Sequence, residues 1–241
     1  MKNKIVVILG PTASGKSTLA LKIAKQFKGE IISSDSRQIY KELNIGSNKI
    51  NKKAQNNIKH HLLNIIKPNE KYNLFNWQKD AFKIINKIHK KNKLPIITGG
   101  TGLYISSILQ NYQLAESKTA PCPYNFLIFG LNPQRKKLYQ EINKRVEKMI
   151  KKGLIKEVQK IYKKYKQRKL ISLSGIGYQE IISYLEKEIT LEEAIKLIQK
   201  NTRNYAKRQM TWFRGMEKQG LKIYWNKNYQ TIEKMVKKIL S

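Results

Sequence analysis

An apolar run at residues 5–9 leads directly into the glycine-rich stretch GPTASGKST, residues 10–18, and an amphipathic stretch follows at residues 16–27. The spacing G-x-x-x-x-G-K-S between a strand and a helix is that of a loop whose backbone N–H groups hold phosphate oxygens. A second short apolar run at residues 30–34 completes a strand–helix–strand unit. The pattern predicts an α/β fold with a P-loop NTPase-like parallel sheet flanked by helices.

The periodicity of the remaining chain predicts a sheet-forming first half and a helical second half. Further strands are predicted at residues 94–100, 126–131 and 221–225, and helices at 76–91, 101–109, 133–151, 154–168, 177–187, 190–214 and 229–240. Residues 112–124, with Pro121 and Pro123, form the candidate junction. We expect a single domain over residues 1–241, in which 1–111 form the phosphate-loop core and 125–241 add the last core strand and the helices.

The charge of the chain limits its partners. Lys and Arg number 49 against 16 Asp and Glu, a formal net charge of +33, and a field of this strength favours a polyanion such as nucleic acid. General over-use of Lys, Asn and Ile is the competing explanation. The single cysteine, Cys122, excludes a disulfide framework and favours a cytoplasmic location. No stretch is long and apolar enough for a signal peptide or membrane span, so we expect no membrane association.

The glycine-rich stretch suits any diphosphate or triphosphate. Lys16 is expected to reach the outer phosphate, and the Ser17 hydroxyl to ligate Mg²⁺. A hydrolysing ATPase normally has an Asp after a later strand, but the run LPIITGG, residues 94–100, ends without an acid. This argues against a motor or a switch.

The chain contains two aspartates, Asp35 and Asp80, and these are the candidates for a general base. Asp80 falls within a helical pattern and is expected on a solvated face. Asp35 follows the second strand, at the edge of the sheet where the phosphate loop also lies. Its carboxylate would either close an Asx turn or take a proton from an attacking hydroxyl or amine. A small-molecule kinase and a transferase to nitrogen both stay open at this point.

Several blocks in the chain decide between these chemistries. They are GPTASGKST, SSDSRQIYKELNIGSNK (33–49), HHLLNIIKPNEKYN (60–73), GGTGLYI (99–105), LSGIGYQEIISYL (173–185) and TRNYAKRQMTWFRG (202–215). Together and in this order they resemble the tRNA dimethylallyltransferase family, over nearly all of residues 3–215. The phosphate loop alone is shared by many unrelated families, so the ordered set carries the resemblance.

The resemblance implies that the dimethylallyl group of dimethylallyl diphosphate passes to N6 of adenosine 37 in tRNAs that read UNN codons, and diphosphate is released. Asp35 would receive the proton of the adenine amine, while Thr101 and Arg145 would contact the diphosphate. The diphosphate-binding residues would be Gly10, Pro11, Thr12, Ala13, Ser14, Gly15, Lys16 and Ser17, with Mg²⁺ held by Ser17 through the diphosphate. The His60–His61 pair matches the family, and we expect no metal there.

The same resemblance places RNA contacts in both halves. Asp35, Ser36, Arg37 and Gln38 would line the site of the flipped adenosine, and Gly175, Gly177, Tyr178, Arg203, Lys207 and Arg208 would contact the tRNA anticodon stem-loop. Part of the aromatic set of residues 202–215 is expected in the core. Unusual backbone dihedrals are the other explanation for the two glycines. The protein is expected to act as a monomer.

The chain departs from the family at one place. Members usually carry a helical insertion between the blocks that match residues 99–109 and 126–131, and here about a dozen residues bridge the gap. Its loss predicts an enzyme with intact diphosphate chemistry and weaker tRNA binding, for which the positive charge would compensate through phosphate contacts. A prenyltransferase for free adenine nucleotides, a small-molecule P-loop kinase and a non-enzymatic RNA-binding remnant are the alternatives.

Overall fold

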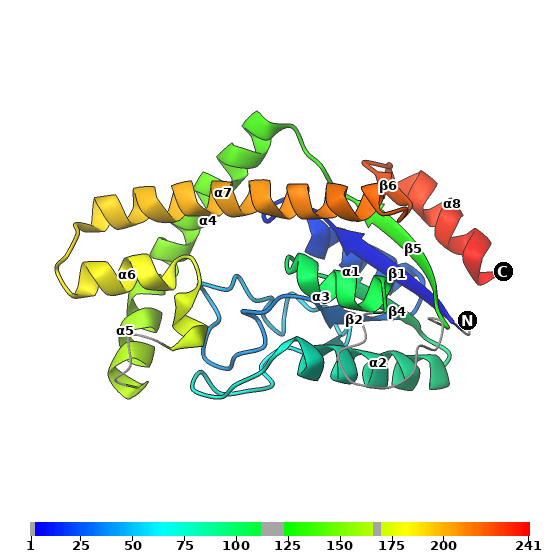
Figure 1. Cartoon of the computed structure of the whole chain (residues 1–241), viewed down its shortest axis with the longest axis horizontal. Coiled ribbons are helices and arrows are strands. Elements are labelled where there is room, and N and C mark those ends of the chain that lie inside the picture. The colour runs from blue at the N-terminus through cyan, green and yellow to red at the C-terminus, as the bar shows by residue number, and fades with distance from the viewer. Residues whose placement is uncertain (1–2, 112–122, 166–169) are drawn as a thin grey trace.

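The computed structural model describes residues 3–111, 123–165 and 170–241 and contains a parallel six-stranded sheet, in the order β3-β2-β4-β1-β5-β6 (Figure 1). The strands are β1 (Lys4–Leu9), β2 (Gly29–Ser33), β3 (His60–His61), β4 (Leu94–Thr98), β5 (Asn125–Gly130) and β6 (Ile223–Trp225). Residues 5–9 of the central strand β1 are completely buried. A continuous apolar run of this kind is typical of a parallel strand that is covered on both faces.

The helices are α1 (Lys16–Gln26), α2 (Leu74–Lys90), α3 (Gly102–Leu109), α4 (Arg135–Lys151), α5 (Leu154–Tyr165), α6 (Tyr178–Leu185), α7 (Leu191–Lys218) and α8 (Tyr229–Leu240), with a 3₁₀ helix, η1 (Ile171–Ser174). One face of β1 packs through Val6 and Ile8 on α1 and α8. The other packs through Ile5, Val7 and Leu9 on α2, α3 and the end of α7. The sheet is therefore the middle layer of three.

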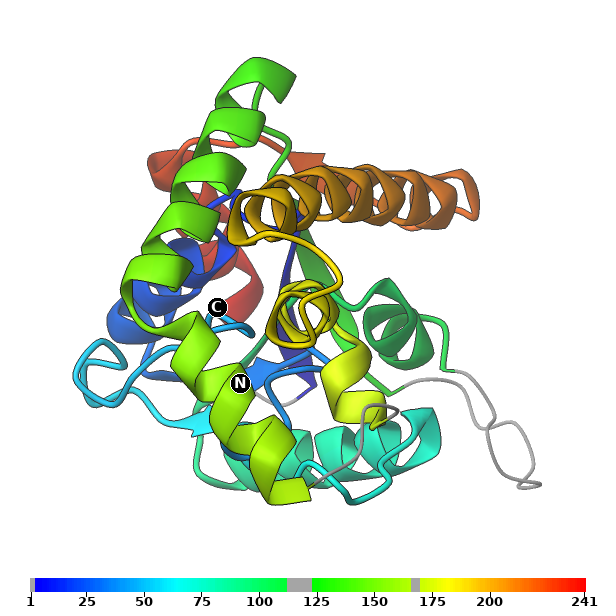
Figure 2. The ribbon, with the colours of Figure 1, turned by 90° about the vertical axis from the view of Figure 1, so that its left-hand side faces the viewer.

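A second core lies beyond the carboxyl end of the sheet. It joins α4, α5, α6 and the first part of α7, and it includes Ile39, Tyr40 and Leu43 from the segment after β2. Helix α7 runs along the length of the molecule, from the helical end to the sheet (Figure 1). Figure 2 shows the molecule from the helical end, with the long axis of Figure 1 directed toward the viewer. The predicted α/β fold with a parallel sheet and a helical second half is confirmed.

The boundaries differ from the predicted ones in ways that have local causes. Helix α2 begins earlier than predicted, because the Asn73 side chain caps it by accepting from Asn76 N. Helix α7 begins after Thr190, which caps it in the same way, and extends beyond the predicted end at 214 to Lys218. Strand β3 and helix η1 are too short to produce a periodic pattern, and the sequence did not predict them. Residues 112–122 and 166–169, and with them Cys122, lie outside the described residues.

Within the described residues, no helix is long and apolar enough to cross a membrane.

Candidate active site

The phosphate loop follows β1 and opens α1. Gly15 stands at the N-cap with φ 91°, a left-handed conformation that favours glycine, and no side chain caps the helix. The backbone N–H groups of the first turn are therefore directed at the space in front of the helix, where an anion can accept from them. The predicted loop thus has the local geometry of a phosphate site.

Lys16 is buried in this loop. Its ammonium donates to Pro11 O at 2.6 Å, and burial lowers its pKa to about 7, helped by the charge of Arg145 and opposed by that of Asp35. The side chains of Lys16, Arg145 and Asp35 therefore interact electrostatically in a region that is shielded from solvent. An added anion would favour the charged form of Lys16.

The loops after β2 and β4 meet beside the phosphate loop. Ser34 N donates to Thr98 O at 2.9 Å and Thr101 N donates to Ser34 O at 3.0 Å, so the ladder continues past the strand ends. Ser36 N then donates to Thr101 Oγ1 at 3.0 Å. We call the three loops, residues 10–17, 34–38 and 99–101, the sheet rim.

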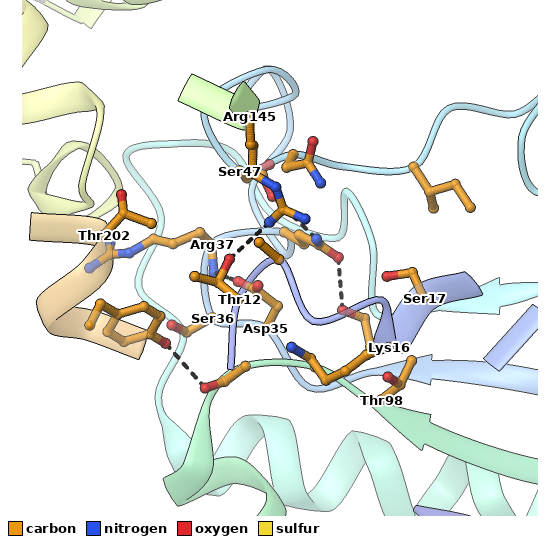
Figure 3. A pocket seen from close by; sticks show the side chains of 18 of the residues that line it. Thr12, Lys16, Ser17, Asp35, Ser36, Arg37, Ser47, Thr98, Arg145 and Thr202 are labelled. Atoms are coloured by element: carbon orange, nitrogen blue, oxygen red, sulfur yellow. Dashed lines mark hydrogen bonds between the residues drawn. The ribbon is translucent and has the colours of Figure 1, made fainter. Parts of the chain in front are cut away.

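Asp35 lies at the centre of the sheet rim. Its Oδ1 accepts from Arg37 N at 2.9 Å, the hydrogen bond of an Asx turn. The carboxylate also lines the cavity and points to the same region as Lys16 and Arg145 (Figure 3). The two interpretations of Asp35 are thus compatible, since the turn uses one oxygen and fixes the direction of the other.

A cavity of about 540 Å³ lies over the sheet rim and is closed by helices on its far side. The polar side chains of α4 and α7 that line the cavity are Arg145, Thr202, Tyr205, Arg208 and Gln209, which we call the helical wall. A cavity of this size is in the range that holds a cofactor-sized ligand.

Two side chains of the helical wall are bonded directly to the phosphate loop. Arg145 Nη1 donates to Thr12 Oγ1 at 2.8 Å. Burial lowers the pKa of Arg145, and the negative charge of Asp35 opposes this shift. Gln209 Oε1 accepts from Thr12 N at 2.8 Å. Gln209 was not among the site residues predicted from the sequence. Its spacing of four residues from Tyr205 places both on one helix face, and that was the available signal.

Arg37 and Gln38 fasten the sheet rim to its surroundings. The Arg37 guanidinium donates to Ile171 O and, at 3.0 Å, to Ser174 Oγ of η1. Gln38 accepts from Ser33 Oγ at 3.1 Å and donates to Ser47 O at 3.2 Å. Both line the cavity together with Ser36, but several of their hydrogen-bonding groups hold the loop in place.

Tyr178 does not have the exposure that RNA contact requires. Tyr178 is 1% exposed and its hydroxyl donates to Glu157 Oε1 at 2.9 Å, so the side chain that was expected to contact tRNA is enclosed within the protein. Gly177 has φ 94°, whereas the φ of Gly175 is −77°. The explanation by unusual dihedrals therefore holds for Gly177 alone, while Gly175 lines the cavity beside Arg37.

The basic residues of α7 have different surroundings. Lys207 and Arg208 are exposed, and Arg208 borders the cavity with its guanidinium 5.8 Å from the Tyr205 ring centre. Arg203 donates to Asn143 Oδ1 at 2.9 Å and so ties α7 to α4. Among the aromatic residues Phe213 is completely buried and Trp212 is 43% exposed, which confirms that part of this set belongs to the core.

The other candidate polar residues lie in separate networks. His61 Nε2 is 2.7 Å from Glu30 Oε2, and His60 Nδ1 is 2.8 Å from Ile58 O. Asp80 is half-buried and accepts from the Tyr72 hydroxyl at 2.8 Å, so the prediction of a purely solvated face is wrong in this respect.

A phosphate-type loop after the central strand β1 of a parallel sheet, with a carboxylate after β2, two strands away in the sheet, defines a P-loop enzyme that binds a phosphorylated substrate beside a group able to accept a proton. The family model described as IPP transferase matches residues 38–121 and 113–216. The chain belongs to this family.

Curated relatives and solved structures agree with this assignment. A tRNA dimethylallyltransferase of Acetivibrio thermocellus is 35% identical over 98% of this chain and 96% of its own length, and one of Carboxydothermus hydrogenoformans is 34% identical over 100% and 97%. The tRNA isopentenylpyrophosphate transferase of Bacillus halodurans superposes with a TM-score of 0.87 at 30% identity, over 99% of this chain and 96% of its own. A eukaryotic dimethylallyltransferase, studied acting on tRNA, gives 0.76 at 25% identity over 88% and 70%.

The length of the first alignment bears on the missing insertion. It extends over 305 positions, more than the 241 residues of this chain. The two matches to the family model meet at residues 113–121, within the predicted junction. This relative therefore contains residues for which this chain has no counterpart.

Proposed function

We propose that this protein transfers the dimethylallyl group of dimethylallyl diphosphate to N6 of adenosine 37 in tRNAs that read UNN codons. The observation that carries the proposal is the position of Asp35. Its carboxylate faces Lys16 and Arg145 across the cavity, so a group that can accept a proton lies next to an anion-binding loop. A reaction that deprotonates an amine while a diphosphate leaves needs this arrangement.

The reaction follows from the residues around the cavity. The N6 amine attacks the allylic carbon, the bond from that carbon to the bridging oxygen breaks, and diphosphate leaves with the electron pair. Asp35 takes the proton from nitrogen. Lys16, the backbone N–H groups of residues 15–17 and Arg145 stabilise the charge on the leaving diphosphate, and each such donor is typically worth about 10²–10³ in rate. The Thr101 hydroxyl donates to Ser36 Oγ at 3.3 Å, and in this reaction it would contact the bridging oxygen.

Mg²⁺ fits this loop as an ion held mainly by the substrate. Ser17 is exposed in the first turn of α1 beside Lys16. Residues 3–111, 123–165 and 170–241 contain no group of three or more His, Cys, Asp or Glu side chains that could hold a metal. Magnesium bound through substrate phosphates and water needs only one or two protein ligands. Ser17 would be such a ligand, and the ion would neutralise charge on the diphosphate.

The RNA partner is the anticodon stem-loop, from which the target adenosine must leave its stack to enter the cavity. Arg208 is exposed at the border of this cavity and Lys207 is exposed beside it on α7, and the net charge of +33 supports further phosphate contacts. We expect the logarithm of the tRNA affinity to fall steeply with the logarithm of salt concentration, at a slope of about −0.9 per phosphate neutralised. A slope that corresponds to one or two phosphates would contradict compensation by charge for the missing insertion.

One assay tests the activity. The protein is incubated with dimethylallyl diphosphate, Mg²⁺ and unmodified tRNA that reads UNN codons, and the digested RNA is analysed for N6-dimethylallyladenosine. Parallel reactions replace the tRNA by AMP, or the diphosphate by ATP with a small-molecule acceptor. Product in the tRNA reaction supports the proposal. Product with AMP but not with tRNA would assign the protein to nucleotide prenylation, and phosphate transfer from ATP would make it a kinase.

A further inference from the structure

The Gln209 side chain bridges two loops of the sheet rim that are far apart in the sequence. Its Oε1 accepts from Thr12 N at 2.8 Å, and its Nε2 donates to Gly100 O at 2.7 Å. These partners are 197 and 109 residues away along the chain. The side chain is 4% exposed, so both ends of a buried amide are satisfied at the same time.

Each of these loops continues into a group that the proposed reaction uses. Thr12 is held a second time through its hydroxyl, which accepts from Arg145 Nη1 at 2.8 Å. Gly100 precedes Thr101, whose Oγ1 accepts from Ser36 N at 3.0 Å, directly after Asp35 in the chain. Gln209 therefore connects the diphosphate side of the cavity with the side that receives the proton.

The fit around Gly100 leaves no room for a side chain. A Cβ there would lie 2.5 Å from Gln209 Nε2. The Tyr205 hydroxyl, one helical turn before Gln209, donates to the same carbonyl at 3.2 Å. Two side chains of α7 thus hold one carbonyl of the sheet rim, and the glycine is required by their close approach.

We propose that Gln209 is a positioning residue that fixes the spacing between the phosphate loop and the Thr101 loop. This inference rests on the proposed transfer reaction. The amide holds the diphosphate and the proton acceptor at a constant separation, so that the attacking amine and the allylic carbon are in line. It also joins this spacing to the helix that carries the exposed Lys207 and Arg208. Its loss is expected to slow the chemical step and to leave tRNA affinity unchanged.

Two variants of similar length separate the parts of this role. Gln209→Met removes both hydrogen bonds, and since a displacement of 1 Å can cost about 10²-fold, we expect a loss of that order in the single-turnover rate. Gln209→Glu keeps the acceptor for Thr12 N but places a carboxylate oxygen against Gly100 O and a negative charge near the diphosphate, so a loss at least as large as that of Gln209→Met is expected. Diphosphate should bind more weakly to Gln209→Met. The tRNA dissociation constant should stay at the wild-type value in both.

Two further variants control for packing. Asn201→Leu removes another amide of α7. This amide donates to Glu180 Oε1 at 2.7 Å and does not contact the sheet rim, so the variant should keep the wild-type rate. Gly100→Ala would displace the Gln209 amide and should reproduce the loss. Combined with Gln209→Met, it should add little, because both changes remove the same connection.

The outcomes are distinguishable from those of the proposed function. A single-turnover rate of folded Gln209→Met within threefold of wild type, or a loss explained by tRNA affinity alone, would overturn the inference. Additive effects of Gly100→Ala and Gln209→Met would do the same. If wild-type protein transfers nothing, the proposed function fails, and the inference is then judged by diphosphate binding. Equal affinities of wild type and Gln209→Met would overturn it in that case.

Discussion

The sheet rim and the helical wall border the same cavity, but they are held in different ways. The sheet rim is fixed by backbone hydrogen bonds that continue the strand ladder, such as Ser34 N to Thr98 O. The helical wall reaches the cavity with a few long side chains, among them Arg145 and Gln209. We infer that the sheet rim supplies the reacting groups and that the helical wall supplies their alignment and charge. Changes in the two regions should therefore differ in size and in kind.

Asp35→Asn, in the sheet rim, is expected to have the largest effect. An amide of the same shape keeps the turn to Arg37 N but cannot take the proton, and loss of a general base typically costs about 10²–10⁴ in rate. Single-turnover prenylation of tRNA measures this, with diphosphate affinity as a second readout. Asp80→Asn is the matched control, because Asp80 is the second of the two aspartates and lies in another network. A rate above one tenth of wild type for Asp35→Asn would show that Asp35 is not the base.

Lys16→Met should weaken diphosphate binding by about 10²–10³, and it should also change the pH dependence. In the free protein the pKa of Lys16 is lowered to about 7, and bound diphosphate favours the charged form. The contribution of Lys16 to diphosphate affinity is therefore complete below pH 7 and falls above pH 7, by up to about tenfold per pH unit. Binding above pH 7 is accompanied by uptake of a proton.

Calorimetry from pH 6 to pH 9, in buffers of different ionisation enthalpy, measures both quantities. The comparison of wild type with Lys16→Met cancels the titration of the diphosphate itself. Lys93→Met is the control, since Lys93 directly precedes β4 and pairs with Glu30 at the amino ends of the strands, opposite the sheet rim. Parallel pH profiles for wild type and Lys16→Met would refute the role of the lysine charge.

Arg145→Met tests the helical wall and should have a smaller effect than either change in the sheet rim. It removes one buried charge and the hydrogen bond to Thr12 Oγ1, so we expect kcat/KM to fall by about 10–10², at the lower end of what one donor contributes. Arg135→Met, on the same helix, provides the control because Arg135 is exposed and bonds to Tyr139. A loss as large as that of Asp35→Asn would remove the distinction between the two regions.

Glu157→Gln should affect stability and hardly affect the reaction. The Glu157 carboxylate accepts from the backbone of Asn44, Ile45 and Gly46, and also from the Tyr178 hydroxyl. Glutamine replaces one carboxylate oxygen by an NH₂ group, so some of these donors lose their acceptor, and we expect a loss of about 1–3 kcal/mol in the free energy of unfolding. Thermal or urea unfolding measures this, and kcat should change less than threefold. Glu147→Gln, exposed on α4, should lie within about 0.5 kcal/mol of wild type.

The sheet rim was largely predictable from the sequence because its residues are close in the chain or follow apolar strands. Residues 10–17 form one loop whose shape depends on backbone conformation, and the glycines mark it. Asp35 was found by elimination and by its place after a strand. Arg145 was expected only from the resemblance to a family, since nothing local distinguishes it from other basic residues on exposed helix faces.

The parts that could not be predicted depend on contacts between distant segments. Tyr178 was expected to contact tRNA, yet it is buried, because an aromatic residue at a helix start gives no local sign that Glu157 and Gly46 will enclose it. Arg37 was expected to contact RNA, yet its guanidinium is occupied by η1, more than a hundred residues later. Gln209 was missed because its partners are 197 and 109 residues away.

The sequence by itself determined the parallel sheet, the phosphate loop and the acid beside it. These follow from apolar periodicity and from the backbone requirements of consecutive residues. Only the tertiary structure decided which side chains of α4 and α7 reach the cavity and which loops they connect. A helix face is set by its own sequence, but its partner is set by packing across the whole chain, and the amide of Gln209 acquires its two bonds only when α7 lies over the sheet rim.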